Sequence, residues 1–179
     1  MVYVMLADGF EEVEALTVVD YLRRAGISLA TVGVTGGVVT GAHDIPVTAD
    51  CLLAEISPQE AEMIVLPGGG LGTEHLKKSS EVRSAVKECY EAGGLIAAIC
   101  AAPSVLGEMG LLSGKQAVCY PGFEGALHGA TLSTQPVVRD GRLITAKAAG
   151  AAARFAYELI SVLTDRERAE QIRGQVYDC

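Results

Sequence analysis

Cys100 is the residue of this chain whose position is best suited to chemistry, because it lies where an apolar strand runs directly into a helix. The strand is Leu95–Ile99, and Ala101 opens a small-residue segment that leads to Pro103, a residue that suits a first helical turn. A side chain on such a turn projects above the sheet, near free N–H groups whose partial positive charge favours a thiolate. The alternative is an inert core cysteine, since free cysteine is among the most buried residue types.

Two further segments place glycine or acidic residues where a predicted strand ends. Residues 7–14, Ala-Asp-Gly-Phe-Glu-Glu-Val-Glu, follow the strand Val2–Leu6, and residues 67–70, Pro-Gly-Gly-Gly, follow the strand Glu62–Leu66. The carboxyl ends of parallel strands meet at one edge of a sheet, where ligands bind in open α/β folds. We therefore expect these two loops and the Cys100 turn to lie together.

Apolar runs alternate with helical patterns, which predicts a layered α/β sandwich in which helices cover both faces of a parallel sheet with Leu95–Ile99 as its central strand. Further strands are predicted at Ser28–Val34, as a hairpin within Thr35–Ala49, at Gln116–Cys119, and as Val137–Arg139 paired with Arg142–Thr145. Helices are predicted at Glu11–Ala25, Ser79–Ala92, Ala101–Met109, Gly150–Leu163 and Asp165–Val176. Since no repeat or linker interrupts residues 1–179, we expect a single domain.

Composition and charge exclude several classes of partner. The chain has 179 residues, 50% of them hydrophobic, and a net charge of −8. An acidic surface disfavours nucleic acids and anionic membranes, which need a basic footprint. No secretory leader precedes the first strand, and the longest apolar stretch is too short for a membrane span, so we expect a cytoplasmic protein without a membrane anchor. The five cysteines are scattered and form no CxxC pair, so neither disulfides nor a metal site is expected.

The motifs GFEEVE, LPGGGLG and AAICAAP occur in this order. Through them the chain resembles the ThiJ/PfpI superfamily over nearly its whole length, in particular the DJ-one branch that contains the parkinsonism-associated protein deglycase. The resemblance implies a flavodoxin-like three-layer sandwich with Cys100 at a nucleophile elbow. It also implies that Glu14 lies beside Cys100, stays protonated and donates a hydrogen bond that lowers the thiol pKa. Gly68 and Gly69, with the N–H of Ala101, would then hold a developing oxyanion.

Without the resemblance, Glu14 has a second interpretation. Glu11, Glu12 and Glu14 all fall in the first turns of a predicted helix, where acidic residues complement the helix dipole. Helical periodicity also places Glu14 off the apolar stripe, which indicates solvent rather than a pocket. The stripe consists of Val13, Leu16, Val19 and Leu22.

The chain also departs from the family pattern. Tyr120 stands before Pro121, where many members carry a histidine, so a Cys-His dyad is missing and cysteine-protease chemistry becomes less favoured. Tyr120 can still donate a phenolic hydrogen bond to a substrate oxygen. His128 is expected in an exposed loop. Residues 145–150, Thr-Ala-Lys-Ala-Ala-Gly, stand where relatives often carry arginine followed by Gly-Pro-Gly.

The resemblance further implies a homodimer in which Arg24 and the hairpin residue His43 approach the partner's cysteine pocket. The alternative for Arg24 is a structural role, since cations suit the carboxyl end of a helix. The other cysteines are expected to be packing or incidental thiols: Cys51 in a loop, Cys89 on a helix, Cys119 on a strand and Cys179 at the terminus.

The activity that the resemblance implies is glyoxalase III-like or deglycase-like handling of reactive dicarbonyls, without a cofactor or glutathione. The Cys100 thiolate would attack methylglyoxal, Glu14 would move a proton between adjacent carbons, and hydrolysis would release lactate. The alternative is a redox-sensing or chaperone-like protein in which Cys100 is oxidised without turnover. Both require Cys100 to be the most acidic and most readily oxidised of the five thiols.

Overall fold

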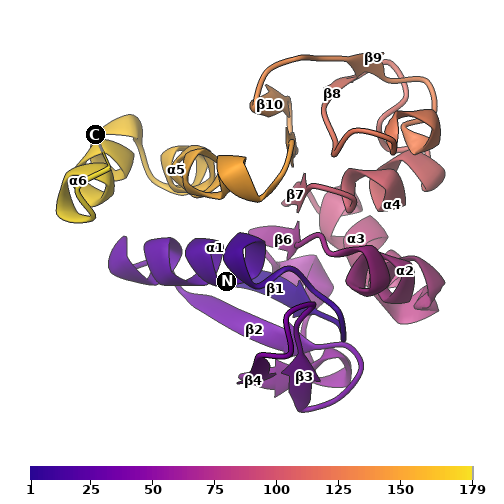
Figure 1. Ribbon diagram of the computed structural model, residues 1–179, viewed down its shortest axis with the longest axis horizontal. Helices are drawn as coiled ribbons and strands as arrows, with labels where there is room; N and C mark the ends of the chain where they lie inside the picture. Colours follow the sequence, from indigo (N-terminus) through magenta and orange to yellow (C-terminus); the bar gives the residue numbers. More distant parts are fainter. Residues whose placement is uncertain (179) are drawn as a thin grey trace.

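In the computed structural model, which describes residues 1–178, a seven-stranded sheet runs through the middle of the molecule (Figure 1). In order across the sheet its strands are β10 (Val137–Asp140), β11 (Leu143–Ala146), β7 (Leu95–Ile99), β6 (Met63–Leu66), β1 (Val2–Leu6), β2 (Leu29–Gly33) and β5 (Cys51–Leu52). All neighbours are parallel except β10 and β11, which form an antiparallel pair. This confirms the predicted sandwich with a mostly parallel sheet, although β6 rather than β7 is its central strand.

Helices cover both faces of this sheet, as Figure 1 shows. One face carries α1 (Glu12–Arg24), α5 (Ala152–Leu163) and α6 (Arg166–Gln175), and the other carries α2 (Gly70–Lys78), α3 (Ser80–Glu91) and α4 (Pro103–Glu108). Side chains alternate along each strand, so that in β1 Val4 and Leu6 enter the core under α1 while Met5 enters the opposite core. Burial on both faces explains why the strands are continuously apolar.

Two short pairs of strands lie outside the main sheet. The predicted hairpin is confirmed as β3 (Val38–Thr40) paired antiparallel with β4 (Pro46–Thr48). The predicted strand at residues 116–119 is shorter: β8 (Gln116–Ala117) pairs only with β9 (Thr131–Leu132). Four 3₁₀ turns complete the described elements: η1 (Leu53–Glu55), η2 (Pro58–Glu60), η3 (Glu124–Ala126) and η4 (Ala149–Ala151).

The helix α2 differs most from the sequence prediction, which placed residues 67–70 in a glycine-rich loop and gave no bounds for a helix before residue 79. Glycine is a poor helix former, and the first turn of α2 contains Gly70 and Gly72, so the sequence pattern obscured the helix. Tertiary contacts compensate: the N–H of Gly72 donates to the carbonyl of Gly9, and Leu76 is buried. The helix after Cys100 also begins later than expected, at Pro103, because the two preceding alanines belong to the turn.

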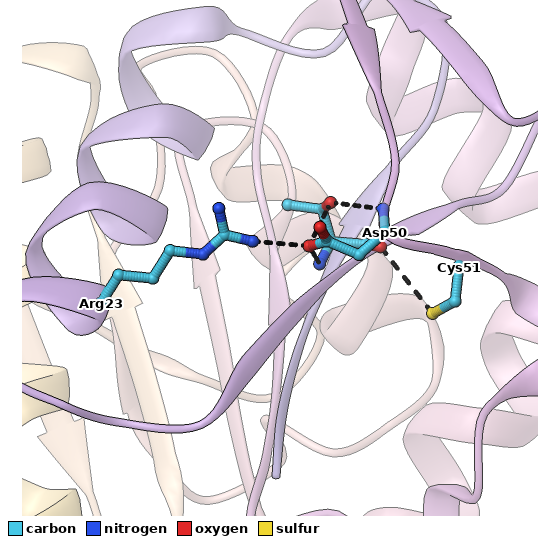
Figure 2. A network of polar contacts seen from close by, with 4 residues as sticks. Arg23, Asp50 and Cys51 are labelled. Carbon is cyan, nitrogen blue, oxygen red and sulfur yellow. Dashed lines mark hydrogen bonds and ion pairs between the residues drawn. The ribbon is translucent and has the colours of Figure 1, made fainter.

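Asp50 ties the edge strand β5 and helix α1 to the sheet. Its Oδ2 accepts hydrogen bonds from the backbone N–H of Thr31, at 2.8 Å, and from the Arg23 guanidinium, at 2.6 Å. Figure 2 shows Arg23 reaching Asp50, which directly precedes Cys51, the first residue of β5. Arg23 therefore has a structural partner.

The cysteines occupy different environments. Cys51, Cys89, Cys100 and Cys119 are free thiols, and Cys179 lies outside the described residues. Two predicted placements are wrong, since Cys51 belongs to strand β5 and Cys119 follows strand β8 rather than lying in it. Within residues 1–178, no helix combines the length and apolar character needed to cross a membrane.

Candidate active site

The three loops singled out in the sequence meet at one edge of the sheet, at the carboxyl ends of the adjacent strands β1, β6 and β7. Backbone hydrogen bonds connect them: the N–H of Glu11 donates to the carbonyl of Gly68 at 3.0 Å. The N–H of Gly68 in turn donates to Oε2 of Glu14 at 2.9 Å. The predicted convergence of these loops is confirmed, and it arises because parallel neighbours present their carboxyl ends together.

Cys100 forms a sharp turn between β7 and α4. Its φ of 65° lies in the left-handed region, which costs a non-glycine residue about 1–3 kcal/mol and persists only where surrounding structure holds it. Here both backbone groups are held, because the Cys100 N–H donates to Ala146 at 2.9 Å and its carbonyl accepts from the N–H of Tyr120 at 2.7 Å. The turn keeps the thiol half-buried above the sheet.

Glu14 is buried in the same place, with 1% of its surface exposed, and its carboxyl lies beside the Cys100 thiol, near enough for each group to shift the pKa of the other. The sequence periodicity had indicated solvent for this residue, and that interpretation is wrong. The predicted stripe is correct at Val19 and Leu22, which are buried, but wrong at its start, since Val13 is 51% exposed while Ala15 and Val18 are fully buried. The first turn of α1 thus directs the Glu14 side chain toward the loop that contains Gly68.

Glycine at position 68 is required by this packing. A Cβ there would collide with Oε2 of Glu14 and lie 2.5 Å from the Cβ of Cys100. Gly69 has a φ of 92°, and a Cβ there would collide with the carbonyl of Gly9. The two glycines therefore let backbone approach the thiol where side chains cannot fit.

Backbone N–H groups also lie near the sulfur. Those of Gly69 and Ala101 lower the pKa of the Cys100 thiol, because they favour the charged thiolate. These are two of the three residues expected to hold an oxyanion. The third, Gly68, directs its N–H to Glu14 instead.

The electrostatics of the Glu14 and Cys100 pair are set mainly by burial. Burial raises the pKa of Glu14 to about 7, although hydrogen bonds from Cys100 and Gly68 favour its charged form. Burial, followed by the negative charge of Glu14, raises the pKa of the Cys100 thiol to about 12. The pair therefore gives up one proton near neutral pH and retains the other far more tightly.

While Glu14 is ionised, Cys100 holds its proton tightly, so the expectation that Cys100 is the most acidic thiol stays a prediction for the state in which Glu14 is protonated. Burial raises the pKa of Cys89 and that of Cys119 to about 11, and that of Cys100 to about 12. At Cys100 the carboxylate beside the sulfur adds to the effect of burial, because it disfavours a second negative charge. A thiolate at Cys100 thus requires that Glu14 hold the shared proton.

Thr145 is a residue near the site that the sequence analysis missed as a contributor. Its buried Oγ1 accepts a hydrogen bond from the N–H of Val118 at 3.0 Å and so fixes the segment that leads to Tyr120. The Tyr120 side chain is 47% exposed beside Cys100, with its backbone bound to the Cys100 carbonyl. His128 lies in an exposed turn, as expected.

His43 and Arg24 are not brought together within one chain. His43 lies between β3 and β4, where its Nδ1 is 2.8 Å from Oε2 of Glu12 at the start of α1. Arg24 lies at the opposite end of α1 from Glu12, about 18 Å away along the helix, and its guanidinium is bound to Asp20 at 2.7 Å. Their predicted role in a partner's pocket remains a prediction.

A cavity of about 690 Å³ lies away from these groups, between the loop after β2, the 3₁₀ turns η1 and η2, and α3. Val34, Leu53 and Ile56 line it, among others, and neither Cys100 nor Glu14 does. This cavity and the convergent titratable groups are thus at different places.

Comparisons with known proteins agree with this architecture. The sequence model of the DJ-1/PfpI family matches residues 1–162. The chain is 37% identical to Protein dj-1beta of Drosophila melanogaster, over 94% of this chain and 92% of that protein. It is 28% identical to a protein of Pyrococcus abyssi named as a deglycase, over 90% of this chain and 98% of that one. The solved structure of oxidized Toxoplasma gondii DJ-1 superposes with a TM-score of 0.94 at 34% identity, covering 98% of this chain and 97% of that one.

Proposed function

Because the chain belongs to the DJ-1/PfpI family, we propose that it is a glyoxalase III-like enzyme that converts methylglyoxal to lactate without a cofactor or glutathione. The observation that carries this proposal is the adjacent pair of a half-buried thiol and a buried carboxyl that titrates near neutral pH. The proposal places the enzyme in the cytoplasm, where reduced thiols are the default.

The first step uses the sulfur of Cys100. With the shared proton on Glu14, the thiolate attacks the aldehyde carbon of methylglyoxal, a carbon–sulfur bond forms, and the carbonyl oxygen becomes an alkoxide. The N–H groups of Gly69 and Ala101 are placed to stabilise negative charge beside the sulfur. Glu14 then gives its proton to the alkoxide, which yields a hemithioacetal and leaves Glu14 as a carboxylate.

The second step uses Glu14 as a proton carrier. Its carboxylate takes the hydrogen of the former aldehyde carbon as a proton and returns it to the neighbouring ketone carbon, so that one carbon is oxidised and the other reduced. The product is a lactoyl thioester on Cys100. Water then cleaves the carbon–sulfur bond, which releases lactate and restores the thiol. The sum is methylglyoxal plus water giving lactic acid, with no external oxidant or reductant.

Turnover of methylglyoxal by purified protein without glutathione tests this proposal. We expect Cys100→Ser to lower the rate by about a hundredfold or more. Cys51→Ser is the matched control, because Cys51 is also a half-buried thiol but belongs to the distant edge strand β5, and it should keep the wild-type rate. Wild-type turnover in Cys100→Ser would remove the proposed nucleophile.

The deglycase name of the Pyrococcus relative suggests a second substrate form, the adduct of methylglyoxal with an amine. We propose that this chemistry is the same reaction on aldehyde released from the adduct. The rate of adduct loss should then reach a ceiling set by spontaneous dissociation as enzyme concentration rises. A rate that continues to rise with enzyme concentration would instead establish direct action on the adduct.

A redox or chaperone-like role without turnover is the second candidate. It is favoured by the backbone N–H groups of Gly69 and Ala101, which can also hold sulfinate oxygens, and by a relative whose structure is named as oxidized. Peptide mass spectrometry after mild peroxide treatment should show modification of Cys100 before that of the buried Cys89 and Cys119. Protein that oxidises at Cys100 but consumes no methylglyoxal would favour this candidate.

A further inference from the structure

Outside the Cys100 pair, three side chains with metal-ligating atoms converge between the start of α1 and the tip of the β3–β4 hairpin. They are Glu11, Glu12 and His43, and one ligand atom from each lies within 4.8 Å of the other two. The Nδ1 of His43 is 2.8 Å from Oε2 of Glu12 and 3.8 Å from Oε2 of Glu11. Two adjacent carboxylates thus face one imidazole.

The surrounding backbone holds this arrangement in place. The Glu12 side chain is only 7% exposed, and its Oε1 accepts the backbone N–H of His43 at 2.7 Å. Gly41 leaves the space that Glu12 fills, since a Cβ there would lie 2.7 Å from the Cγ of Glu12. The N–H of Ala42 donates to the carbonyl of Phe10 at 2.8 Å, which fixes the hairpin on the helix start.

The charge and chemistry of the cluster fit a divalent transition metal. Converging carboxylates repel each other, and a divalent cation would neutralise both. Zinc binds carboxylate oxygen and imidazole nitrogen at about 2.0–2.2 Å, which places tetrahedral ligands about 3.4 Å apart. The distances of 2.8 and 3.8 Å from His43 bracket that spacing, so small side-chain rotations suffice. Imidazole favours ions such as Co²⁺ and Zn²⁺ over Ca²⁺ or Mg²⁺.

We propose that Glu11, Glu12 and His43 bind one divalent ion of the Co²⁺ or Zn²⁺ type, with water completing its coordination. In the single chain His43 is 66% exposed and Glu11 is 20% exposed, so the outer side of the cluster is reached by water in the monomer. The sulfur of Cys100 takes no part in the ligand set. The inference is therefore independent of the proposed activity. The sequence did not predict the site because His43 lies 31 residues from Glu12.

Titration of the metal-free, reduced protein with Co²⁺, followed by Zn²⁺ competition, tests the site. We expect one equivalent to bind and to give visible cobalt absorption without a sulfur-to-cobalt charge-transfer band. His43→Gln should weaken binding by at least about tenfold. His128→Gln is the matched control, since His128 is an exposed turn histidine outside the cluster, and it should bind as the wild type does.

Two further variants distinguish the loss of a metal ligand from binding by a thiol and from misfolding of the variant. Cys100→Ser should bind the ion unchanged; loss of binding in Cys100→Ser with binding retained in His43→Gln would overturn the proposal. Glu11→Gln removes a rim ligand without touching the buried Glu12, so it should weaken binding even if His43→Gln proved unstable. Equal affinity in wild type, His43→Gln and Glu11→Gln would also overturn the proposal.

Discussion

At the scale of single residues, the buried carboxyl of Glu14 makes the stability of the fold depend on pH. Its folded pKa of about 7 exceeds the ordinary value of 4.5, so between these values the folded state binds more protons than the unfolded state. The stability that this group contributes is fully present below pH 4.5 and is lost as pH rises through 7. The loss is on the order of 3 kcal/mol.

We therefore expect Glu14→Gln to remove this decline. The amide is neutral at every pH, so the free energy of unfolding of the variant should rise relative to wild type between pH 5 and 8. Urea unfolding at each pH measures this difference. Glu91→Gln, at an exposed position on α3, is the control and should follow the wild-type profile. Parallel profiles for Glu14→Gln and wild type would contradict the assignment.

The same substitution also tests the proton carrier. Glutamine keeps an N–H donor for the sulfur but cannot accept or return a proton, so the turnover of methylglyoxal should collapse while the fold survives.

Gly68 allows a prediction that concerns packing rather than charge. Gly68→Ala would press a methyl group against Glu14 and Cys100, so we expect both lower turnover and a loss of about 1–3 kcal/mol in the free energy of unfolding. Gly70→Ala is the control, because nothing lies within 4 Å of a Cβ there and alanine favours a helix. Thermal unfolding and methylglyoxal assays on both variants give the comparison. Similar behaviour of the two variants would show that the close approach at position 68 is unimportant.

At the scale of elements, the side chain of Thr145 helps to hold the segment after β8 on the sheet. Thr145→Val removes the hydroxyl that accepts the N–H of the buried Val118, and an unpaired buried N–H costs about 1–3 kcal/mol. The midpoint of urea unfolding should fall by a corresponding amount. Thr145→Ser keeps the hydroxyl and should retain most of the stability. If valine and serine variants unfolded alike, the hydrogen bond would not be the stabilising contact.

The elements also show what sequence can and cannot predict here. The strand β7 and the Cys100 turn were predicted correctly, because a fully apolar strand followed by small residues and proline is a local pattern. Helix α2 was missed because its glycines are compensated by contacts with Gly9, about 60 residues earlier. The burial of Glu14 depends on Gly68, 54 residues away, and the raised pKa of Cys100 follows from its own burial and then from the charge of Glu14. Because these contacts join residues that are far apart in the sequence, local periodicity does not predict them.

At the scale of the whole molecule, the sheet explains how the site keeps its geometry. The strands β1, β6 and β7 are adjacent and internal, with a core packed on each face. The helix start that contains Glu14 and the loops that contain Gly68 and Cys100 therefore begin from rigid positions, and the strained Cys100 backbone can be held against its conformational cost. The hairpin β3–β4 lies outside the main sheet, and the N–H of His43 joins it to Glu12 at the start of α1. The hairpin and the start of α1 therefore form one continuous surface.

That surface leads to the prediction of a homodimer through α1 and the hairpin. Val13 on α1 is 51% exposed, and Val38 and Ile45 in and beside the hairpin are 61% and 49% exposed, so large apolar side chains remain uncovered there. Light scattering at micromolar concentration should give twice the chain mass of 18.6 kDa.

Val13→Asp should shift the protein toward monomer, because it places a charge within the contact. Leu132→Asp is the matched control, since Leu132 is 53% exposed but lies on β9, and it should leave the mass unchanged. A wild-type monomer, or a dimer that Leu132→Asp disrupts and Val13→Asp does not, would contradict this interface and with it the predicted role of His43 in a partner's pocket.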